Sequence, residues 1–366
     1  MPGSGVNPLL SGRSAHSQTG MMSLGSVKSG VPRLALPAAV ISAVIVVAAA
    51  MVLGRASGAT TTTSAGPRTG VVVVNTKLAF EPNSAAGTGV VLTSSGRVLT
   101  NNHVIRAATS IRVTDPSDGL SFSATVLGYS VSKDVALLQL QKPRGLKPAA
   151  IGNSSTARVG QSVVAVGNAG GTGSLTTVTG HVTGIGQSID VSDGVDSSNR
   201  LLGLIRTDAP LQPGDSGGPL LANGRVIGID VAASARNSFD STTEGYAIPI
   251  NRAVSIAHQI QTGRRSTTVH VGPTAFLGVL LYPPDYPNDS SGAVVSRVIG
   301  GSAADRAGVR IDDVITAAGG RTIASGSSLR AVMLRAVPGK PLRLVWTDSS
   351  GATRAATVRP GAGPPQ

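Results

Sequence analysis

The chain of 366 residues contains no cysteine, and aromatic side chains make up only 2% of it. The lack of cysteine excludes disulfide bonds, cysteine-ligated zinc sites and thiol nucleophiles. With so few rings for bases to stack on, nucleic-acid binding is not expected. Basic residues exceed acidic ones, for a net charge of +13, but the excess is spread along the chain. Such a charge distribution suits an anionic membrane or envelope surface better than nucleic acid.

The first 70 residues read as a tail, a membrane span and a linker. Residues 1–33 are rich in Ser and Gly and carry only positive charges, which predicts a disordered tail. Residues 34–53 form a run of 20 residues without a charge, which is long enough for one α-helix to cross the membrane. A cleaved signal peptide is the alternative, although its apolar region is usually about 7–15 residues long. Residues 54–70 read as a flexible linker. The flanking charges favour a single-pass protein with a cytoplasmic N-terminus and the remaining chain outside.

From residue 71 to about residue 250, short apolar runs alternate with turn signals, which predicts antiparallel barrels or a sandwich. Asn223-Gly224 lies between two apolar runs and indicates a tight hairpin. The pattern over 251–263 predicts one helix, with Asn251 as N-cap and Gly263 as its stop.

Two further segments follow this region. Residues 264–274 read as a second linker, and residues 275–361 as a smaller unit of short strands with one helix around 327–337. A glycine-rich stretch at 163–173 resembles a phosphate loop, but a nucleotide site needs a helix directly after it. The β-branched residues that follow predict a strand there, so we expect no nucleotide, no metal and no other cofactor.

The stretch QPGDSGGPLL, residues 212–221, places Ser216 in a turn. A serine hydroxyl is a weak nucleophile unless a base accepts its proton and an acid orients that base. Of the five histidines, His103 lies where an apolar strand gives way to a turn, which is a rigid place for an imidazole. Asp134 directly precedes an apolar run and is the candidate acid. Spacing alone does not establish this trio.

The blocks GTGVVLTSSGRVLTNNHVI, SKDVALLQL and TDAPLQPGDSGGPLLANGRVIGI together resemble the HtrA (Deg) family of trypsin-like serine proteases. The resemblance implies a mainly β protein, with a chymotrypsin-like protease domain of two six-stranded β-barrels over residues 71–263. It implies a catalytic triad of His103, Asp134 and Ser216 between the barrels. It also implies an oxyanion hole formed by the backbone N–H groups of Gly214, Asp215 and Ser216.

The chain departs from the family pattern in three places. Asp215 stands where the family commonly has Asn, and NAGG at 168–171 replaces Asn-Pro-Phe-Gly. Pro210 lies six positions before Ser216, where trypsin-like enzymes place an acid that binds basic side chains. We therefore expect a pocket for small or medium apolar residues. Asp208 is read as a structural residue, because a buried acid without a partner is costly.

The C-terminal unit resembles a bacterial PDZ domain, a small α/β domain, through AFLGVLL at 275–281 and the block that follows. The resemblance implies that Phe276, Leu277, Gly278 and Val279 form the loop whose N–H groups hold a peptide's terminal carboxylate. The next strand would accept the peptide by β-augmentation. The alternative is that Phe276 and Leu277 are only core residues, and the two readings are compatible.

The sequence therefore predicts a membrane-anchored bacterial hydrolase, an HtrA-type serine endopeptidase with one PDZ domain. The expected role is ATP-independent protein quality control in the stress response, with cleavage of misfolded or regulatory envelope proteins. The resemblance implies a homotrimer, for which Phe80 is the evident aromatic contact. Peptide capture at the PDZ loop is expected to reorder residues 186–200 and shape the oxyanion hole. The alternatives are a membrane-tethered chaperone or PDZ adaptor with a latent protease domain, and an envelope scaffold that uses its basic surface.

Overall fold

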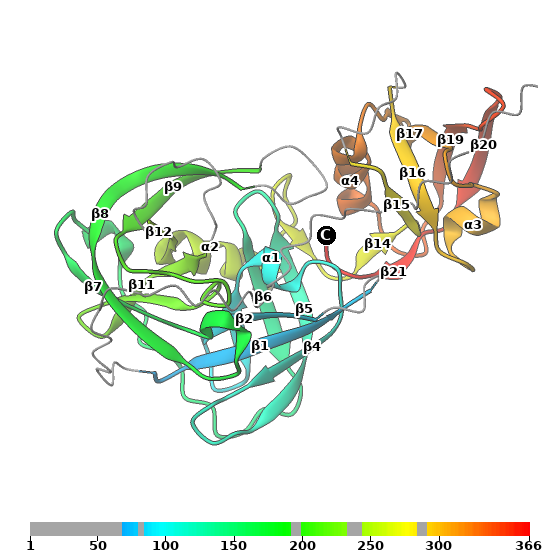
Figure 1. Cartoon of the computed structure of the whole chain (residues 1–366). Coiled ribbons are helices and arrows are strands. Elements are labelled where there is room, and N and C mark those ends of the chain that lie inside the picture. The colour runs from blue at the N-terminus through cyan, green and yellow to red at the C-terminus, as the bar shows by residue number, and fades with distance from the viewer. Residues whose placement is uncertain (1–67, 80–83, 192–198, 233–243, 284–290) are drawn as a thin grey trace, which may run out of the picture. The chain divides into compact units, whose positions relative to one another are not determined.

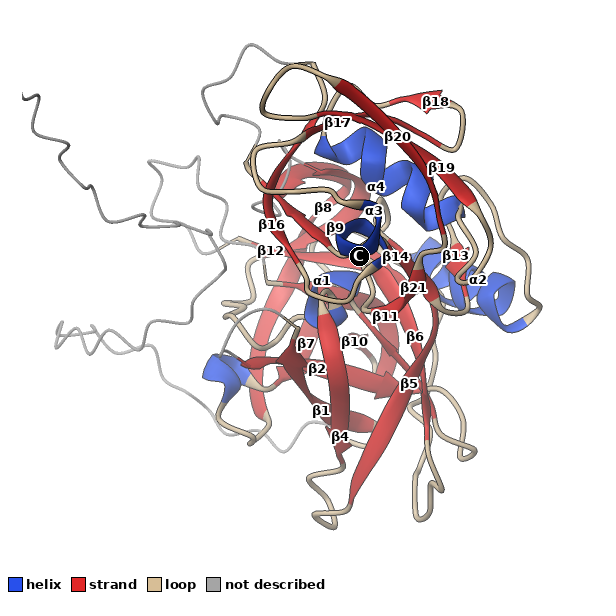
Figure 2. Cartoon of the chain, turned by 90° about the vertical axis from the view of Figure 1, so that its right-hand side faces the viewer, coloured by secondary structure: helices blue, strands red, loops and turns tan. Residues whose placement is uncertain are grey.

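The computed structural model describes residues 68–79, 84–191, 199–232, 244–283 and 291–366 (Figure 1). The predicted tail and membrane span, most of the first linker, and Phe80 lie outside these residues. Among the described residues, no helix is long and apolar enough to span a membrane. Figure 2 shows many strands and few helices, so the mainly β fold class is confirmed.

The first barrel is built from the strands between residues 71 and 140. Its sheet has the order β5-β4-β1-β2-β3-β6, and it closes because β5 also pairs with β6. A short helix, α1 (Asn102–Ile105), follows β3. The strands are β1 (Val71–Leu78), β2 (Ser84–Val91), β3 (Arg97–Thr100), β4 (Ala108–Thr114), β5 (Ser121–Ser130) and β6 (Val135–Leu140). Strand β13 (His270–Val271) adds to β5, so part of the predicted second linker is a strand.

The second barrel closes in the order β10-β11-β12-β9-β8-β7. Asn223 and Gly224 have φ values of 50° and 72° and form the predicted tight turn between β10 and β11. No α-helix follows the glycine-rich stretch; a 3₁₀ turn, η2 (Ala169–Gly171), leads into β8, as predicted. The strands are β7 (Ser162–Gly167), β8 (Thr176–Val191), β9 (Asn199–Thr207), β10 (Pro219–Ala222), β11 (Arg225–Val231) and β12 (Gly245–Pro249).

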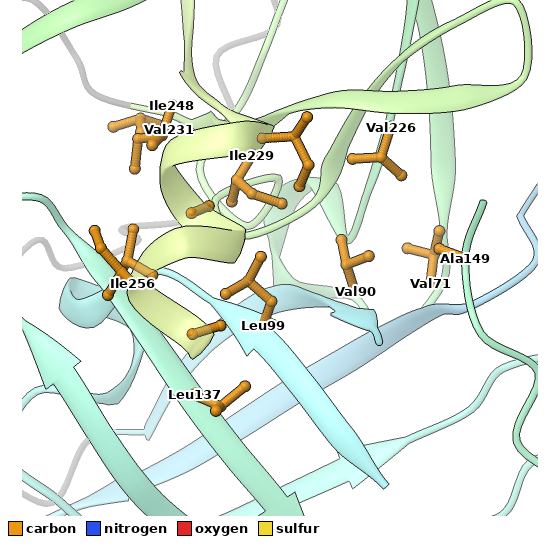
Figure 3. Packing of buried hydrophobic residues seen from close by; sticks show 14 of the residues in the cluster. Val71, Val90, Leu99, Leu137, Ala149, Val226, Ile229, Val231, Ile248 and Ile256 are labelled. Carbon is orange, nitrogen blue, oxygen red and sulfur yellow. The ribbon is translucent and has the colours of Figure 1, made fainter. Parts of the chain in front are cut away.

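A hydrophobic cluster joins the two barrels and the helix α2 (Ile250–Gln261). Leu99 of the first barrel, Ile229 of the second and Ile256 of α2 all belong to it, and Figure 3 shows these side chains. The predicted N-cap at Asn251 is wrong, because Pro249 occupies the cap position. The Asn251 side chain instead bonds to the 153–154 turn, which fastens the start of α2 to the loop before β7.

The C-terminal unit has a sheet in the order β15-β16-β17-β19-β20, with β18 paired to β17, and a separate pair β14–β21. Helix α4 begins with a capping box between Ser325 and Ser328 and confirms the helix predicted near 327–337. Trp346, the only tryptophan of the chain, is buried in this core. The elements are β14 (Thr274–Phe276), β15 (Val279–Leu281), β16 (Ala293–Val298), α3 (Ala303–Ala307), β17 (Val314–Ala318), β18 (Arg321–Thr322), α4 (Gly326–Arg335), β19 (Leu342–Thr347), β20 (Thr353–Val358) and β21 (Gly361–Gly363).

Candidate active site

His103 and Asp134 are joined by two hydrogen bonds. Nδ1 of His103 lies 2.8 Å from Oδ2 of Asp134, and the backbone N–H of His103 donates to Oδ1 at 2.9 Å. His103 lies on α1, directly after β3, and Asp134 lies in the turn that leads into β6. Because both carboxylate oxygens accept hydrogen bonds, Nδ1 carries a proton, so the lone pair of a neutral ring lies on Nε2. The neutral imidazole is thus held in the tautomer that can accept a proton at Nε2.

The backbone of Asp134 is held in an unusual conformation. Its φ is 52°, in the left-handed region that Asp tolerates better than most residues. The side-chain amide of Asn101 donates to the carbonyl of Asp134 at 2.9 Å. This bond fixes the turn and keeps the buried carboxylate aimed at His103.

The turn that carries Ser216 is bonded to both barrels. The N–H of Thr88, on β2, donates to the Ser216 carbonyl at 2.8 Å, and the Thr88 hydroxyl donates to the Gly214 carbonyl at 2.7 Å. On the other side, the N–H of Gly217 donates to the carbonyl of Asp230, on β11, at 2.9 Å. The position of Ser216 is therefore set by backbone contacts to two separate strands.

Two glycines of this turn are required by space as well as by backbone angle. Gly214 has a φ of 100°, and a Cβ there would lie 2.1 Å from the Asn168 carbonyl oxygen. Gly217 has a φ of 86°, and a Cβ there would lie 2.1 Å from the Thr88 carbonyl oxygen. Any side chain at either position would push the turn away from its supports.

Gly87 lies between the Ser216 turn and the helix α1. A Cβ at Gly87 would lie 2.7 Å from the Val104 methyl groups and 3.2 Å from the Ser216 carbonyl oxygen. The Ser216 hydroxyl accepts a hydrogen bond from the Ala232 N–H at 3.1 Å, and it has no hydrogen bond to His103 in this structure. Such bonds commonly tighten only when substrate binds. The Ser216 turn therefore lies against the segment that carries His103, which is itself bonded to Asp134.

The predicted oxyanion donors differ in their availability. The N–H of Asp215 donates to the Gln212 carbonyl at 2.9 Å, so it is already engaged within the turn. The N–H groups of Gly214 and Ser216 have no hydrogen-bond partner among the described residues. Two of the three predicted N–H groups are therefore free to meet a ligand.

Sequence reasoning missed one residue beside the nucleophile, Asp230. It lies in β11, is fully buried, and neither carboxyl oxygen has a hydrogen-bond partner among the described residues. Burial raises its pKa well above the usual range, and the charge of nearby Asp215 raises this pKa further. Burial likewise raises the pKa of Asp215 to about 6. The available signal was a single acid inside the apolar run RVIGIDVA.

Asp208 takes part in a local contact, but it is not the buried acid that the sequence reading assumed. Its Oδ1 accepts a hydrogen bond from the His181 N–H at 2.5 Å, next to the start of the segment that leads to Ser216. The carboxyl is about half exposed rather than buried. Pro210, two residues further along, is exposed.

The predicted carboxylate loop connects β14 to β15. The Leu277 carbonyl accepts from the Ala304 N–H, and the Gly278 carbonyl accepts from the Ile299 N–H, both at 2.9 Å. Leu277 is also a core residue, which confirms that reading of its side chain, and the carboxylate loop stays a prediction. Strand β15, which begins at Val279, pairs with β16, and no other described strand pairs with its second edge.

Comparisons with known proteins agree with both parts of the chain. The Trypsin-like peptidase domain family matches residues 87–229, and the PDZ domain family matches residues 275–347. The chain is similar to the serine protease PepD of Mycobacterium tuberculosis (strain ATCC 25618 / H37Rv), with 33% identity over 307 residues that cover 80% of this chain and 63% of PepD. It is also similar to the periplasmic pH-dependent serine endoprotease DegQ of Escherichia coli (strain K12), with 35% identity over 275 residues that cover 72% of this chain and 57% of DegQ.

The chain thus spans less than two thirds of the length of these two curated relatives. Among solved structures, the HtrA-type protease AlgW with tripeptide has 26% sequence identity and a TM-score of 0.45, over 81% of this chain and 95% of that chain. On the family matches and the curated relatives, the chain belongs to the HtrA family of trypsin-like serine proteases that carry a PDZ domain.

Proposed function

We propose that the protein is an ATP-independent serine endopeptidase that hydrolyses peptide bonds through Ser216, His103 and Asp134. The observation that carries this proposal is the 2.8 Å pair of His103 and Asp134 beside a turn that presents Ser216 with two unengaged N–H groups. This set supplies a nucleophile, an oriented base and donors for a developing negative charge.

In the first half of the reaction, Oγ of Ser216 attacks the carbonyl carbon of the scissile bond. The hydroxyl proton moves to Nε2 of His103, and the Asp134 carboxylate stabilises the resulting imidazolium. The carbonyl oxygen becomes an oxyanion that accepts hydrogen bonds from the N–H groups of Gly214 and Ser216. Collapse of this intermediate breaks the C–N bond, and His103 returns its proton to the leaving amine, which leaves an acyl-enzyme.

In the second half, water replaces the amine. His103 accepts a proton from the water as its oxygen attacks the acyl carbon, and a second oxyanion forms at the same donors. Collapse releases the new carboxyl terminus, and the proton returns to Oγ of Ser216. Each oxyanion donor of this kind typically contributes ~3–4 kcal/mol to transition-state stabilisation.

The proposed substrates are misfolded or regulatory envelope proteins that present small or medium apolar side chains to the site. The absence of an acid at position 210, where Pro210 stands, supports this preference. The relative DegQ is named a periplasmic endoprotease, which supports an extracytoplasmic location. We include in the proposal a single membrane span over 34–53 and a homotrimeric assembly, both of which rest on sequence alone.

A direct test is to treat the full chain with a fluorophosphonate probe and to map the modified residue by mass spectrometry, with casein cleavage measured in parallel. Modification of Ser216 together with cleavage supports the proposal. Cleavage without modification would identify a contaminant or a different nucleophile. A folded protein that shows neither, even after C-terminal peptides are added, would favour the alternative of a tethered chaperone or PDZ adaptor.

The PDZ unit is proposed to bind C-terminal peptides along the open edge of β15. With the carbonyls of Leu277 and Gly278 engaged inside the domain, the N–H groups of this loop are the proposed carboxylate donors. Gly326 at the start of α4 lies close to Leu281, so α4 flanks the same strand.

Gly278→Ala is expected to weaken peptide binding at least tenfold. Gly278 has a φ of 91°, and a Cβ there would lie 2.0 Å from Cβ of Ser302, so the loop must shift. Anisotropy of a labelled peptide with an apolar C-terminal residue measures the loss. Gly300→Ala is the matched control, because a Cβ there meets nothing within 4 Å. Equal weakening in both variants would contradict a carboxylate site at this loop.

A further inference from the structure

Two carboxyl groups flank the nucleophile inside the second barrel. Asp215 directly precedes Ser216, and Asp230 lies on β11, behind the same turn. The N–H of Gly217 donates to the Asp230 carbonyl, and the N–H of Asp230 donates to the Gly218 carbonyl at 2.8 Å. The backbone of Asp230 is thus fastened to the residues directly after Ser216.

The two side chains are both buried, and their polar atoms are incompletely bonded. Oδ2 of Asp215 accepts from the Gln212 N–H at 2.8 Å, while its Oδ1 has no hydrogen-bond partner among the residues that the structure describes. Within the same residues neither oxygen of Asp230 has a partner, and Asp230 is fully buried. A buried carboxylate without a donor or a counter-charge is too costly to persist, so the group takes up a proton instead.

No cation compensates this pair within the described residues. Neither Asp215 nor Asp230 forms an ion pair there, and no side chain donates to either carboxyl group. The neighbouring strands β9, β11 and β12 and the helix α2 carry the charged or titratable side chains Arg200, Arg206, Arg225, Tyr246, Arg252 and His258, with Glu244 next to β12. His103 and Asp134 belong to the first barrel. Arg206 bonds to Glu244, Arg225 to the Ile151 carbonyl and Arg252 to the Leu202 carbonyl, so these three cations are engaged elsewhere.

We propose that Asp215 and Asp230 hold one proton between them, and that this proton-sharing pair is a positioning device for the Ser216 turn. Asp230 carries the proton and donates it to the free oxygen of Asp215, whose second oxygen accepts from Gln212. This hydrogen bond links Asp215, the residue before Ser216, to Asp230 on β11 and so holds the turn against that strand. Like charges in one buried site cannot both ionise, which is why a single proton is retained.

The shared proton also determines whether the stability of the folded protein rises or falls with pH. The unfolded chain releases protons from both groups near pH 4, whereas the folded protein retains one at higher pH. Since the folded state then binds more protons than the unfolded state, its stability falls as pH rises above about 4. This fall continues until the folded protein loses the shared proton from Asp230, whose pKa burial raises well above the usual range.

The first test compares the wild type with Asp230→Asn in urea unfolding between pH 4 and pH 8. The amide of Asn donates to Asp215 but does not titrate. The folding equilibrium constant should therefore fall less steeply with pH in this variant than in the wild type, and the two slopes should differ by about tenfold per pH unit in that window. Infrared spectra should show a protonated-carboxyl band at pH 6 in the wild type that Asp230→Asn lacks. Identical pH slopes and identical bands would overturn the proposal. Asp190→Asn, an exposed acid, is the matched control.

The second test concerns positioning and rests on the proposed function, because it follows the rate of fluorophosphonate labelling. Asp230→Leu removes the donor and is expected to slow labelling about 10- to 100-fold. Asp230→Asn keeps a donor at this position and is expected to label at close to the wild-type rate. A folded Asp230→Leu variant that labels at the wild-type rate would overturn the positioning role. If the wild type itself does not label, the proposed function fails, but the pH slope and the infrared band still decide whether the proton is shared. They decide it equally if Asp230→Leu does not fold.

Discussion

Ser216→Ala is expected to abolish peptide-bond hydrolysis, with a loss in kcat of about a millionfold. The alanine has no oxygen to form the acyl-enzyme, and the base and the oxyanion donors alone give only the small residual rate of water attack. The fold should be retained, because the Ser216 turn is held by backbone bonds and the hydroxyl accepts only one, from Ala232. Casein cleavage and fluorophosphonate labelling measure the loss.

Ser130→Ala provides the matched control for this variant. Ser130 is a fully buried serine of the first barrel whose hydroxyl has no hydrogen-bond partner in the described part of the chain. Its removal should leave both cleavage and labelling unchanged, and both variants should unfold cooperatively. Cleavage that survives in a purified Ser216→Ala protein would mean that another residue is the nucleophile.

Asp134→Asn is expected to lower kcat about 10⁴-fold. Both oxygens of Asp134 accept hydrogen bonds, one from the backbone N–H of His103 and one from its Nδ1. An asparagine offers one oxygen and one NH₂ group, so only one of these donors can be satisfied. If the NH₂ group faces Nδ1, the ring proton moves to Nε2, which then cannot accept the proton of Ser216. If it faces the backbone N–H, two donors meet in a buried site.

Steady-state kinetics on a peptide substrate measure this effect, and we expect the change in kcat rather than in KM because the acid acts on the base. Asp115→Asn is the matched control. Asp115 is a buried acid of the same barrel whose Oδ1 accepts from the Ser117 N–H in a turn, and asparagine supports that turn equally well. Similar losses in the two variants would indicate general damage to the barrel rather than loss of the orienting acid.

Much of this architecture was predictable, because the informative residues are ones that local chemistry constrains. The Asn223-Gly224 hairpin and the end of α2 at Gly263 follow from positive φ angles that these residues tolerate. The glycines around Ser216 could be interpreted once the three sequence blocks were considered together. The HtrA-type protease fold followed from the order of those blocks and the PDZ unit from the segment that starts at residue 275, and the structure confirms the mainly β fold.

Other features depend on contacts between distant segments, which no local pattern encodes. The cap of α2 lies at Pro249 because Asn251 bonds to a loop about 97 positions earlier. The engagement of the Asp215 N–H by Gln212 arises from the closed geometry of the turn. The importance of Asp230 becomes visible only when β11 is placed behind Ser216, since an acid in a strand is ordinarily read as an exposed side chain.

The division of His103, Asp134 and Ser216 between two barrels also determines the order in which they are synthesised. His103 and Asp134 belong to the first barrel, and Ser216 follows in the second, with the strands that seal the shared core coming later still. A ribosome delivers these parts in sequence, first His103 and Asp134 and last Ser216. Under the proposed mechanism, a half-made chain would therefore contain no complete site. Proteolytic activity would then arise only after β12 and α2 had been synthesised and packed.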